Sequence, residues 1–224
     1  MGIFRKAAQP NLSLLISFIV LMLLPGLVEG QFWASRLFDL SLFAVLIFGA
    51  LAAKPEKKLF LPLVALAALA IASKWGLWFL DDVRLTYIYL VSSGLFLTII
   101  LYVFARHVFL ANKINTNIIY GAVCFYLFLG TLLAVIYMGL EVLAPGAFSF
   151  PMDFVKSGSG FEWNQQLREL FYYSFVTQTT LGFGDITPVA PLARNLSILQ
   201  AITGQFYIAI LIARLIGLYL VQKK

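Results

Sequence analysis

A short polar stretch, TTLGFGD, lies at residues 179–185, between two long apolar runs of the chain. It contains no histidine, cysteine or lysine, so it has few side chains that could act in acid–base or nucleophilic catalysis. Its plentiful groups are backbone carbonyls and threonine hydroxyls, which are hard oxygen ligands suited to a Group 1 or 2 cation. Gly182 and Gly184 can adopt backbone angles closed to other residues, which would let successive carbonyls point the same way. The stretch therefore predicts a cation site made of main-chain oxygens.

A short helix is predicted directly before this stretch, over residues 164–179. Asn164 can cap its start, and apolar residues recur along one side at helical spacing. At ~1.5 Å per residue, such a helix reaches only about 20 Å, which is short of a full membrane crossing. We therefore expect it to enter the membrane and return, with its C-terminal dipole end favouring a cation. The non-helical stretch that follows must then be buried by protein or line a watery cavity.

The rest of the chain indicates an integral membrane protein. Of its 224 residues, 62% are hydrophobic and 12% are charged, which is outside the range of soluble globular proteins. Apolar runs that approach or exceed the ~20 residues of a spanning helix cover residues 12–28, 37–53, 59–80, 85–105, 116–140 and 192–220. They lack the alternation of a membrane β-barrel. The expected fold class is an all-α membrane protein, with six transmembrane helices plus a re-entrant helix and loop.

The charged residues predict how these helices are oriented. With the N-terminus inside, the inner side carries nine cations and one acid, Glu56, so the net charge of +6 does not indicate a nucleic-acid partner. The positive-inside rule then places both termini in the cytoplasm, and we expect a protein of the plasma membrane. A cleaved signal peptide over the first run is the alternative, but cleavage would remove the excess of cations on the inner side. The inner cations are Arg5, Lys6, Lys54, Lys57, Lys58, Arg106, Lys113, Lys223 and Lys224.

In this context TTLGFGD resembles the signature of tetrameric potassium channels of the prokaryotic type, Thr-x-Gly-Tyr/Phe-Gly-Asp, which follows a pore helix and precedes an inner helix. The resemblance covers roughly residues 116–220. It implies a selectivity filter in which K⁺ is bound by the carbonyls of Thr180, Leu181, Gly182 and Phe183. The Thr180 hydroxyl would add a ligand at the inner end, and Gly184 and Asp185 would form the outer mouth. One chain supplies only one such strand and cannot surround an ion, so the resemblance implies a homotetramer.

The resemblance also implies supporting roles around the filter and along the last span. Filter support is expected from Tyr172, Tyr173 and Thr179. Gly204 matches the family's inner-helix hinge glycine, with helix packing as the alternative. A stripe that recurs every four residues is expected to face the pore and to close it by dewetting, with ordinary packing as the alternative. It consists of Ile208, Ile212, Ile216 and Leu220.

Two residues depart from the commonest pattern of that family. Leu181 replaces a valine or isoleucine, and Phe183 replaces a tyrosine whose hydroxyl would tie the filter to the aromatic residues around it. Neither change alters a carbonyl, so potassium selectivity is expected together with a looser outer filter. Val176 stands where some relatives carry a glutamate that pairs with the filter aspartate. Asp185 therefore needs another partner, which the sequence does not name.

Two functional parts are expected along the chain. Short loops between the first four apolar runs predict an antiparallel four-helix transmembrane bundle over residues 1–110. Residues 111–224 are expected to form the pore module, with an outer helix, pore helix, filter and inner helix. No soluble regulatory domain is expected in this chain.

The first bundle does not resemble a conventional voltage sensor. A sensor needs several cations at three-residue spacing, because each charge contributes only ~2.3 kcal/mol per 100 mV. The fourth span has no charge between Arg84 and Arg106. A group of charges near the outer end of the third span is expected to reach the membrane interface and to pair locally, with a ligand or proton sensor as the alternative. It consists of Lys74, Asp81, Asp82 and Arg84.

The sequence therefore favours a potassium-selective channel that conducts passively through a tetrameric pore. A weakly selective cation channel and a cation transporter with the same motif are the alternatives, although such transporters generally carry four pore loops per polypeptide. A membrane enzyme is disfavoured because no cluster of catalytic side chains occurs at membrane depth. Cys124 is the only cysteine and the chain has one histidine, so neither an intrachain disulfide nor a metal site is expected. No cofactor is expected beyond the permeant K⁺.

Overall fold

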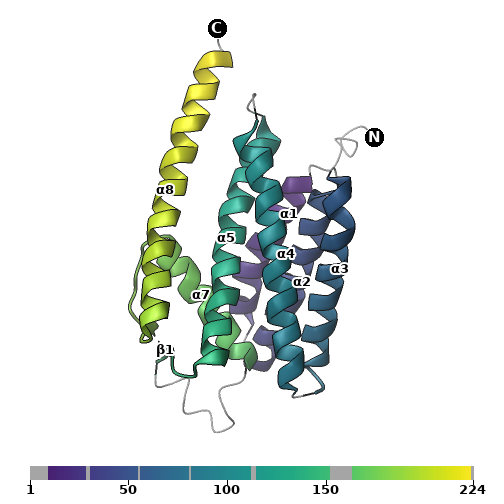
Figure 1. The fold of residues 1–224 in the computed structure, drawn as a ribbon, viewed down its shortest axis with the longest axis vertical. Helices are drawn as coiled ribbons and strands as arrows, with labels where there is room; N and C mark the ends of the chain where they lie inside the picture. The colour runs from purple at the N-terminus through teal and green to yellow at the C-terminus, as the bar shows by residue number, and fades with distance from the viewer. Residues whose placement is uncertain are drawn as a thin grey trace. The chain divides into compact units, whose positions relative to one another are not determined.

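The computed structural model describes residues 10–28, 31–54, 56–80, 82–111, 115–151 and 163–222 (Figure 1). The chain packs as two compact units, one made of residues 1–128 with 218–224 and the other of residues 129–217. The division falls inside α5 (Thr116–Leu143). The boundary predicted at residue 110 separates parts with different functions. A division by packing does not test such a boundary, which stays a prediction.

The first unit consists of helices joined by short connections. They are α1 (Pro10–Leu23), the 3₁₀ turn η1 (Leu24–Leu27), α2 (Gln31–Ala52), α3 (Lys57–Gly76), α4 (Val83–Phe109) and the first half of α5. α1 packs on α2, α2 on α3, and α3 on α4. Short connections make successive helices antiparallel neighbours, as Figure 1 shows for α1 to α4.

Aromatic rings fill the core of the first unit. Phe18 of α1 and Phe104 of α4 contact Phe128 of α5, with ring centroids 5.0 and 5.5 Å apart. Gly49 of α2 faces the same rings, and a Cβ there would lie only 3.1 Å from Phe128 and 3.3 Å from Phe96. A small residue at this position lets the helix approach the rings closely.

Five stretches of the described residues are helical, long and apolar enough to cross a membrane. They are Trp33–Ala52, Lys58–Gly76, Val83–Phe109, Thr116–Leu143 and Pro191–Arg214. The first predicted span forms only a shorter apolar helical stretch, Asn11–Leu27, so six full-length spans are not confirmed. Within this stretch α1 gives way to η1 next to Pro25, because proline has no N–H to continue the α-helical ladder. The chain is an all-α protein with the apolar helices of a multi-pass membrane protein.

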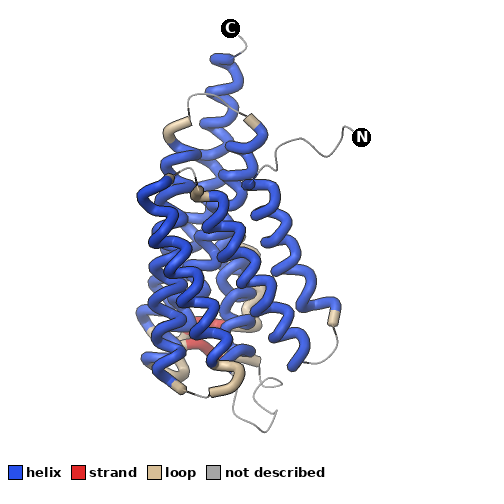
Figure 2. The backbone as a smooth tube through the Cα atoms, turned by 90° about the vertical axis from the view of Figure 1, so that its right-hand side faces the viewer, coloured by secondary structure: helices blue, strands red, loops and turns tan. Residues whose placement is uncertain are grey.

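The second unit continues α5 and positions the polar stretch. It adds β1 (Phe148–Ser149), α7 (Trp163–Gln178), β2 (Thr187–Pro188) and α8 (Pro191–Gln222), whose last residues extend beyond the unit. The two strands pair antiparallel, with Phe148 opposite Pro188, and are the red segments of Figure 2. α7 agrees with the helix predicted over residues 164–179, but it begins at Trp163. Asn164 therefore lies in the first turn and is not the cap.

Glu141 organises the chain as it leaves α5. Its two carboxylate oxygens accept hydrogen bonds from the backbone N–H groups of Gly146, at 2.8 Å, and Phe148, at 3.0 Å. Gly146 has a φ of 86°, in the region that favours glycine. The backbone N–H of Val189 donates to the carbonyl of Ala147 at 2.8 Å. The chain that follows the polar stretch is thus attached to the end of α5.

Candidate functional site

The stretch TTLGFGD follows α7 directly and has an alternating backbone. Thr180, Gly182 and Gly184 have positive φ angles of 61°, 59° and 80°, whereas the intervening Leu181 and Phe183 do not. Carbonyls of an ordinary strand point alternately to opposite sides, and alternating left- and right-handed residues bring them to one side instead. A backbone of this kind presents a row of main-chain oxygens, which can replace the water shell of a cation.

The side chains of this stretch are open in the single chain. Leu181 is 61% exposed and Phe183 is 65% exposed. Residues 179–185 are all exposed. Two large apolar side chains therefore lie uncovered beside the row of main-chain oxygens.

Tyr172 contacts the outer end of the stretch in two ways. Its hydroxyl donates a hydrogen bond to Oδ2 of Asp185 at 2.7 Å. Its ring stacks on that of Phe183, with centroids 6.5 Å apart and an interplanar angle of 13°. The other carboxylate oxygen of Asp185 accepts from the backbone N–H of Ile186 at 3.0 Å. Tyr172 is therefore the partner of Asp185 that the sequence did not name.

A buried glutamine of α8, Gln200, joins three helices of the second unit. Its Nε2 donates to the carbonyl and the hydroxyl of Ser174 in α7, at 3.0 and 2.7 Å, and to Oε1 of Gln178 at 3.3 Å. Its Oε1 accepts from the hydroxyl of Tyr137 in α5 at 2.6 Å. Ser174 in turn donates to the carbonyl of Gly130 at 2.7 Å. Each of these polar groups is satisfied, so the network fixes α7 between α5 and α8.

Tyr173 adds a second polar contact between α7 and α8. Its hydroxyl lies 2.6 Å from the hydroxyl of Ser197, which also bonds the carbonyl of Ala193 at 2.7 Å. Tyr173 was predicted as a filter support, which stays a prediction, and the sequence analysis did not single out Ser197 or Gln200. The available signal was two polar residues three positions apart in an apolar helix, since such residues are placed on one face and usually find partners in a membrane.

Two glycines allow the C-terminal end of α7 to approach its neighbours. A Cβ at Gly204 of α8 would overlap the carbonyl oxygen of Gln178, and one at Gly130 of α5 would lie 2.8 Å from the ring of Phe175. Gly204 is therefore required for packing, which was the alternative to its predicted role as a hinge. The hinge itself stays a prediction.

The inner end of the stretch is held by side-chain hydrogen bonds. The Thr180 hydroxyl donates to the carbonyl of Thr179 at 2.7 Å and accepts from Nε2 of Gln205 in α8 at 2.9 Å. The Thr179 hydroxyl donates to the carbonyl of Phe175 at 2.7 Å. Thr180 is β-branched, and a positive φ is strained for such a residue. Gln205 was not singled out from the sequence.

The stripe along α8 is exposed where the structure describes it. Ile208, Ile212 and Ile216 are 40%, 52% and 55% exposed, and the side chain of Leu220 lies outside the described part. Exposed isoleucines at four-residue spacing share one face of the helix. Their role as a gate stays a prediction.

A buried ion pair lies in the first unit. Nζ of Lys74 in α3 is 3.3 Å from Oδ1 of Asp39 in α2, and both side chains are buried. The indole N–H of Trp78 donates to Oδ2 of Asp39 at 2.9 Å, and the Arg36 guanidinium lies 4.1 Å from the centre of the Trp78 ring. Nζ of Lys74 also lies 5.3 Å from the centre of the Tyr89 ring in α4. Lys74 is paired, as expected, but its partner is Asp39 and its ammonium is buried, so it does not reach interfacial water.

Asp82 and Arg84 of that predicted group lie at the start of α4. Asp82 accepts from the backbone N–H of Arg84 at 2.8 Å and caps α4. Asp81 is outside the described residues.

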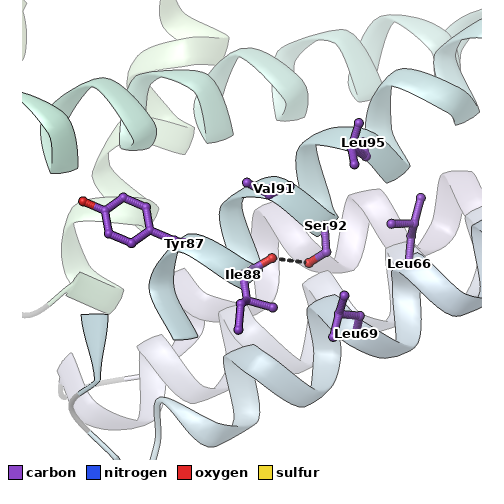
Figure 3. A pocket seen from close by; sticks show the side chains of 7 residues that line it. All are labelled: Leu66, Leu69, Tyr87, Ile88, Val91, Ser92 and Leu95. Atoms are coloured by element: carbon purple, nitrogen blue, oxygen red, sulfur yellow. Dashed lines mark hydrogen bonds between the residues drawn. The ribbon is translucent and has the colours of Figure 1, made fainter. Parts of the chain in front are cut away.

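A groove of about 340 Å³ lies between α3 and α4 of the first unit (Figure 3). Its lining is Leu66, Leu69, Tyr87, Ile88, Val91, Ser92 and Leu95. The hydroxyl of Ser92 donates to the carbonyl of Ile88 at 2.6 Å, the dashed line of Figure 3, so it is already satisfied within its own helix. An apolar lining of this kind suits hydrocarbon and not an ion.

Comparison with known proteins singles out the part of the chain that carries the polar stretch. No curated protein and no solved structure matches the chain. Residues 118–220 match the family model described as "Ion channel". The match takes in most of α5, all of α7, the stretch TTLGFGD and nearly all of α8. Over these residues, the chain is similar to ion channels.

Proposed function

We propose that this protein is a potassium-selective ion channel that conducts K⁺ passively through a homotetrameric pore. The observation that carries the proposal is the alternating backbone of Thr180, Gly182 and Gly184, which lies directly after α7 within the residues that match the ion-channel family. The carbonyls of Thr180, Leu181, Gly182 and Phe183 replace the water shell of the ion.

The exposure of the filter side chains in a single chain supports the assembly of several copies around one axis. One chain contributes one row of oxygens and leaves Leu181 and Phe183 uncovered. Four copies with closed cyclic symmetry would surround an ion with four rows of oxygens and would cover these side chains. Symmetry achieves this with a single sequence. Four Asp185 carboxylates would then lie at the outer mouth with Gly184 and concentrate cations there.

The rest of the module takes the roles expected from the sequence. α8 lines the inner pore, the stripe Ile208, Ile212 and Ile216 closes it when dewetted, and Gly204 combines packing with a hinge. The protein lies in the plasma membrane with both termini in the cytoplasm, where the positive-inside rule places its cations.

Flux from liposomes tests the proposal. Vesicles that contain the purified protein should release K⁺ much faster than Na⁺, and Gly182→Ala should lower K⁺ flux at least about tenfold, because alanine resists a positive φ. Gly146→Ala is the matched control, since Gly146 has a φ of 86° but lies in the outer turn. Undiminished K⁺ flux in Gly182→Ala defeats the filter assignment. Equal K⁺ and Na⁺ fluxes in the unaltered protein favour a weakly selective cation channel.

Removal of one hydroxyl at the mouth should loosen the outer filter. Tyr172→Phe keeps the ring on Phe183 and deletes the 2.7 Å hydrogen bond to Asp185. Currents in planar bilayers should then decline several-fold faster during sustained K⁺ conduction, because the carboxylate loses its hydroxyl donor. Tyr87→Phe, an exposed tyrosine of α4, should leave the decline unchanged. An identical decline in Tyr172→Phe and the unaltered protein would show that this bond does not hold the filter.

A further inference from the structure

We propose that Gln205 is a positioning residue, which orients the Thr180 hydroxyl and thereby raises the K⁺ affinity of the innermost cation site; this inference rests on the proposed channel function. The amide of Gln205 approaches that hydroxyl at 2.9 Å from α8. Nothing in the sequence motif requires a glutamine there, and the residue lies outside the stretch TTLGFGD.

The hydrogen bonds of Thr180 define what its hydroxyl can offer. A hydroxyl has one hydrogen to donate and two lone pairs to accept with. The hydrogen is committed to the carbonyl of Thr179 at 2.7 Å, and one lone pair is committed to the Gln205 amide. The second lone pair of the hydroxyl remains available to a cation, and the two hydrogen bonds fix its direction. A ligand that is oriented before the ion arrives loses less conformational freedom when the ion binds.

Packing next to Gln205 fixes where its amide lies. The preceding residue, Gly204, is in contact with the carbonyl of Gln178 at the end of α7, so closely that a Cβ would not fit. Because α7 continues directly into the stretch, this contact sets the position of Gln205 relative to Thr180. The amide can then counter the strain of a β-branched residue with a φ of 61°.

The surroundings of the glutamine favour such a role over plain packing. Gln205 is exposed in the single chain, in contrast to the buried Gln200 on the same helix, which serves the network around α7. A polar side chain in a membrane-spanning helix is expensive when it faces lipid and is therefore a functional candidate. The polar partner that the structure shows for Gln205 is the filter threonine.

K⁺-dependent thermal stability of the purified full-length protein tests the inference. Binding to the folded state raises Tm with ion concentration, so the K⁺ concentration that gives half of the rise reports affinity. Gln205→Met keeps the length of the side chain and removes the donor, and Gln205→Asn keeps an amide that is too short to reach. Each should raise the half-maximal K⁺ concentration about fivefold, as expected when the four chains together lose the equivalent of one hydrogen bond at the site. Thr203→Val, two residues away and exposed, should leave that concentration unchanged.

The Thr180→Val background distinguishes positioning from a general effect on the fold. Without the hydroxyl, Gln205→Met should cause no further change in the half-maximal K⁺ concentration. A full additional fivefold change in that background overturns the inference, as does an unchanged K⁺ dependence in both Gln205 variants. If the unaltered protein neither conducts K⁺ nor gains stability from it, the proposed channel function fails as well. If the unaltered protein does both and the Gln205 variants match it, only the inference about Gln205 fails.

Discussion

Lys74→Met is expected to lower the free energy of unfolding by about 3–5 kcal/mol, because it leaves the Asp39 carboxylate buried without its cation. Both side chains are buried, at 0% and 1% exposure, so water cannot replace the lost ammonium. The N–H of Trp78 at 2.9 Å satisfies only one of the two carboxylate oxygens. In detergent, Tm should fall by roughly 10 °C, measured from the intrinsic fluorescence of the tryptophans.

Two further variants separate the ion pair from the effect of the substitution. Lys58→Met makes the same replacement on an exposed residue of α3 and should change Tm by less than about 2 °C. Lys74→Met combined with Asp39→Leu should recover most of the lost stability, since a buried pair replaced by apolar side chains is often neutral. If Lys74→Met is no worse than Lys58→Met, the pair is not a stabilising element of the first unit.

Gly204→Ala is expected to destabilise the second unit by about 2–3 kcal/mol and to lower K⁺ flux at least tenfold. The added methyl group would overlap the carbonyl oxygen of Gln178, and backbone cannot give way as the end of a side chain can. Either α8 moves outward or the end of α7 shifts, and the second movement displaces Thr180, the first carbonyl of the proposed filter. Thermal unfolding and liposome flux measure the two effects.

Gly217→Ala is the matched control on the same helix. A Cβ at Gly217 would meet open space, so this variant should be neutral or slightly stabilising, as expected from helix propensity. A Gly204→Ala protein that keeps its Tm and changes only how long the pore stays open would contradict the packing argument and favour the hinge.

Local patterns in the sequence were sufficient to predict α7 and the stretch that follows it. Helical spacing ended where glycines and threonines began, so the helix could be placed to within a residue at each end. At the first span, the pattern predicted the apolar helical stretch but not the change of helix type inside it. The apolar run continues through Pro25, so hydropathy shows no change there. The change of helix type comes from the backbone N–H that proline lacks, which a hydropathy value does not describe.

Such local patterns could not predict contacts between residues far apart in the sequence. No spacing rule joins Asp39 to Lys74 or Tyr172 to Asp185, because their distances depend on how helices pack and where the chain turns. Lys74 was placed at the interface because a lone cation near a helix end usually reaches for water. Its partner two helix turns inside α2 reverses that expectation, and only the packed structure reveals it.

The polar network around Gln200 also constrains the order in which the protein can be made. Ser174 and Gln178 in α7 are satisfied by Gly130 of α5 and by Gln200 of α8. Unpaired, these groups would strongly resist entry into hydrocarbon. A ribosome delivers α8 after α7, so the hydrogen bonds from Gln200 to α7 can form only once the last helix has been made. In the proposed channel, the support of the filter is therefore completed last, and a chain that stalls before α8 lacks it.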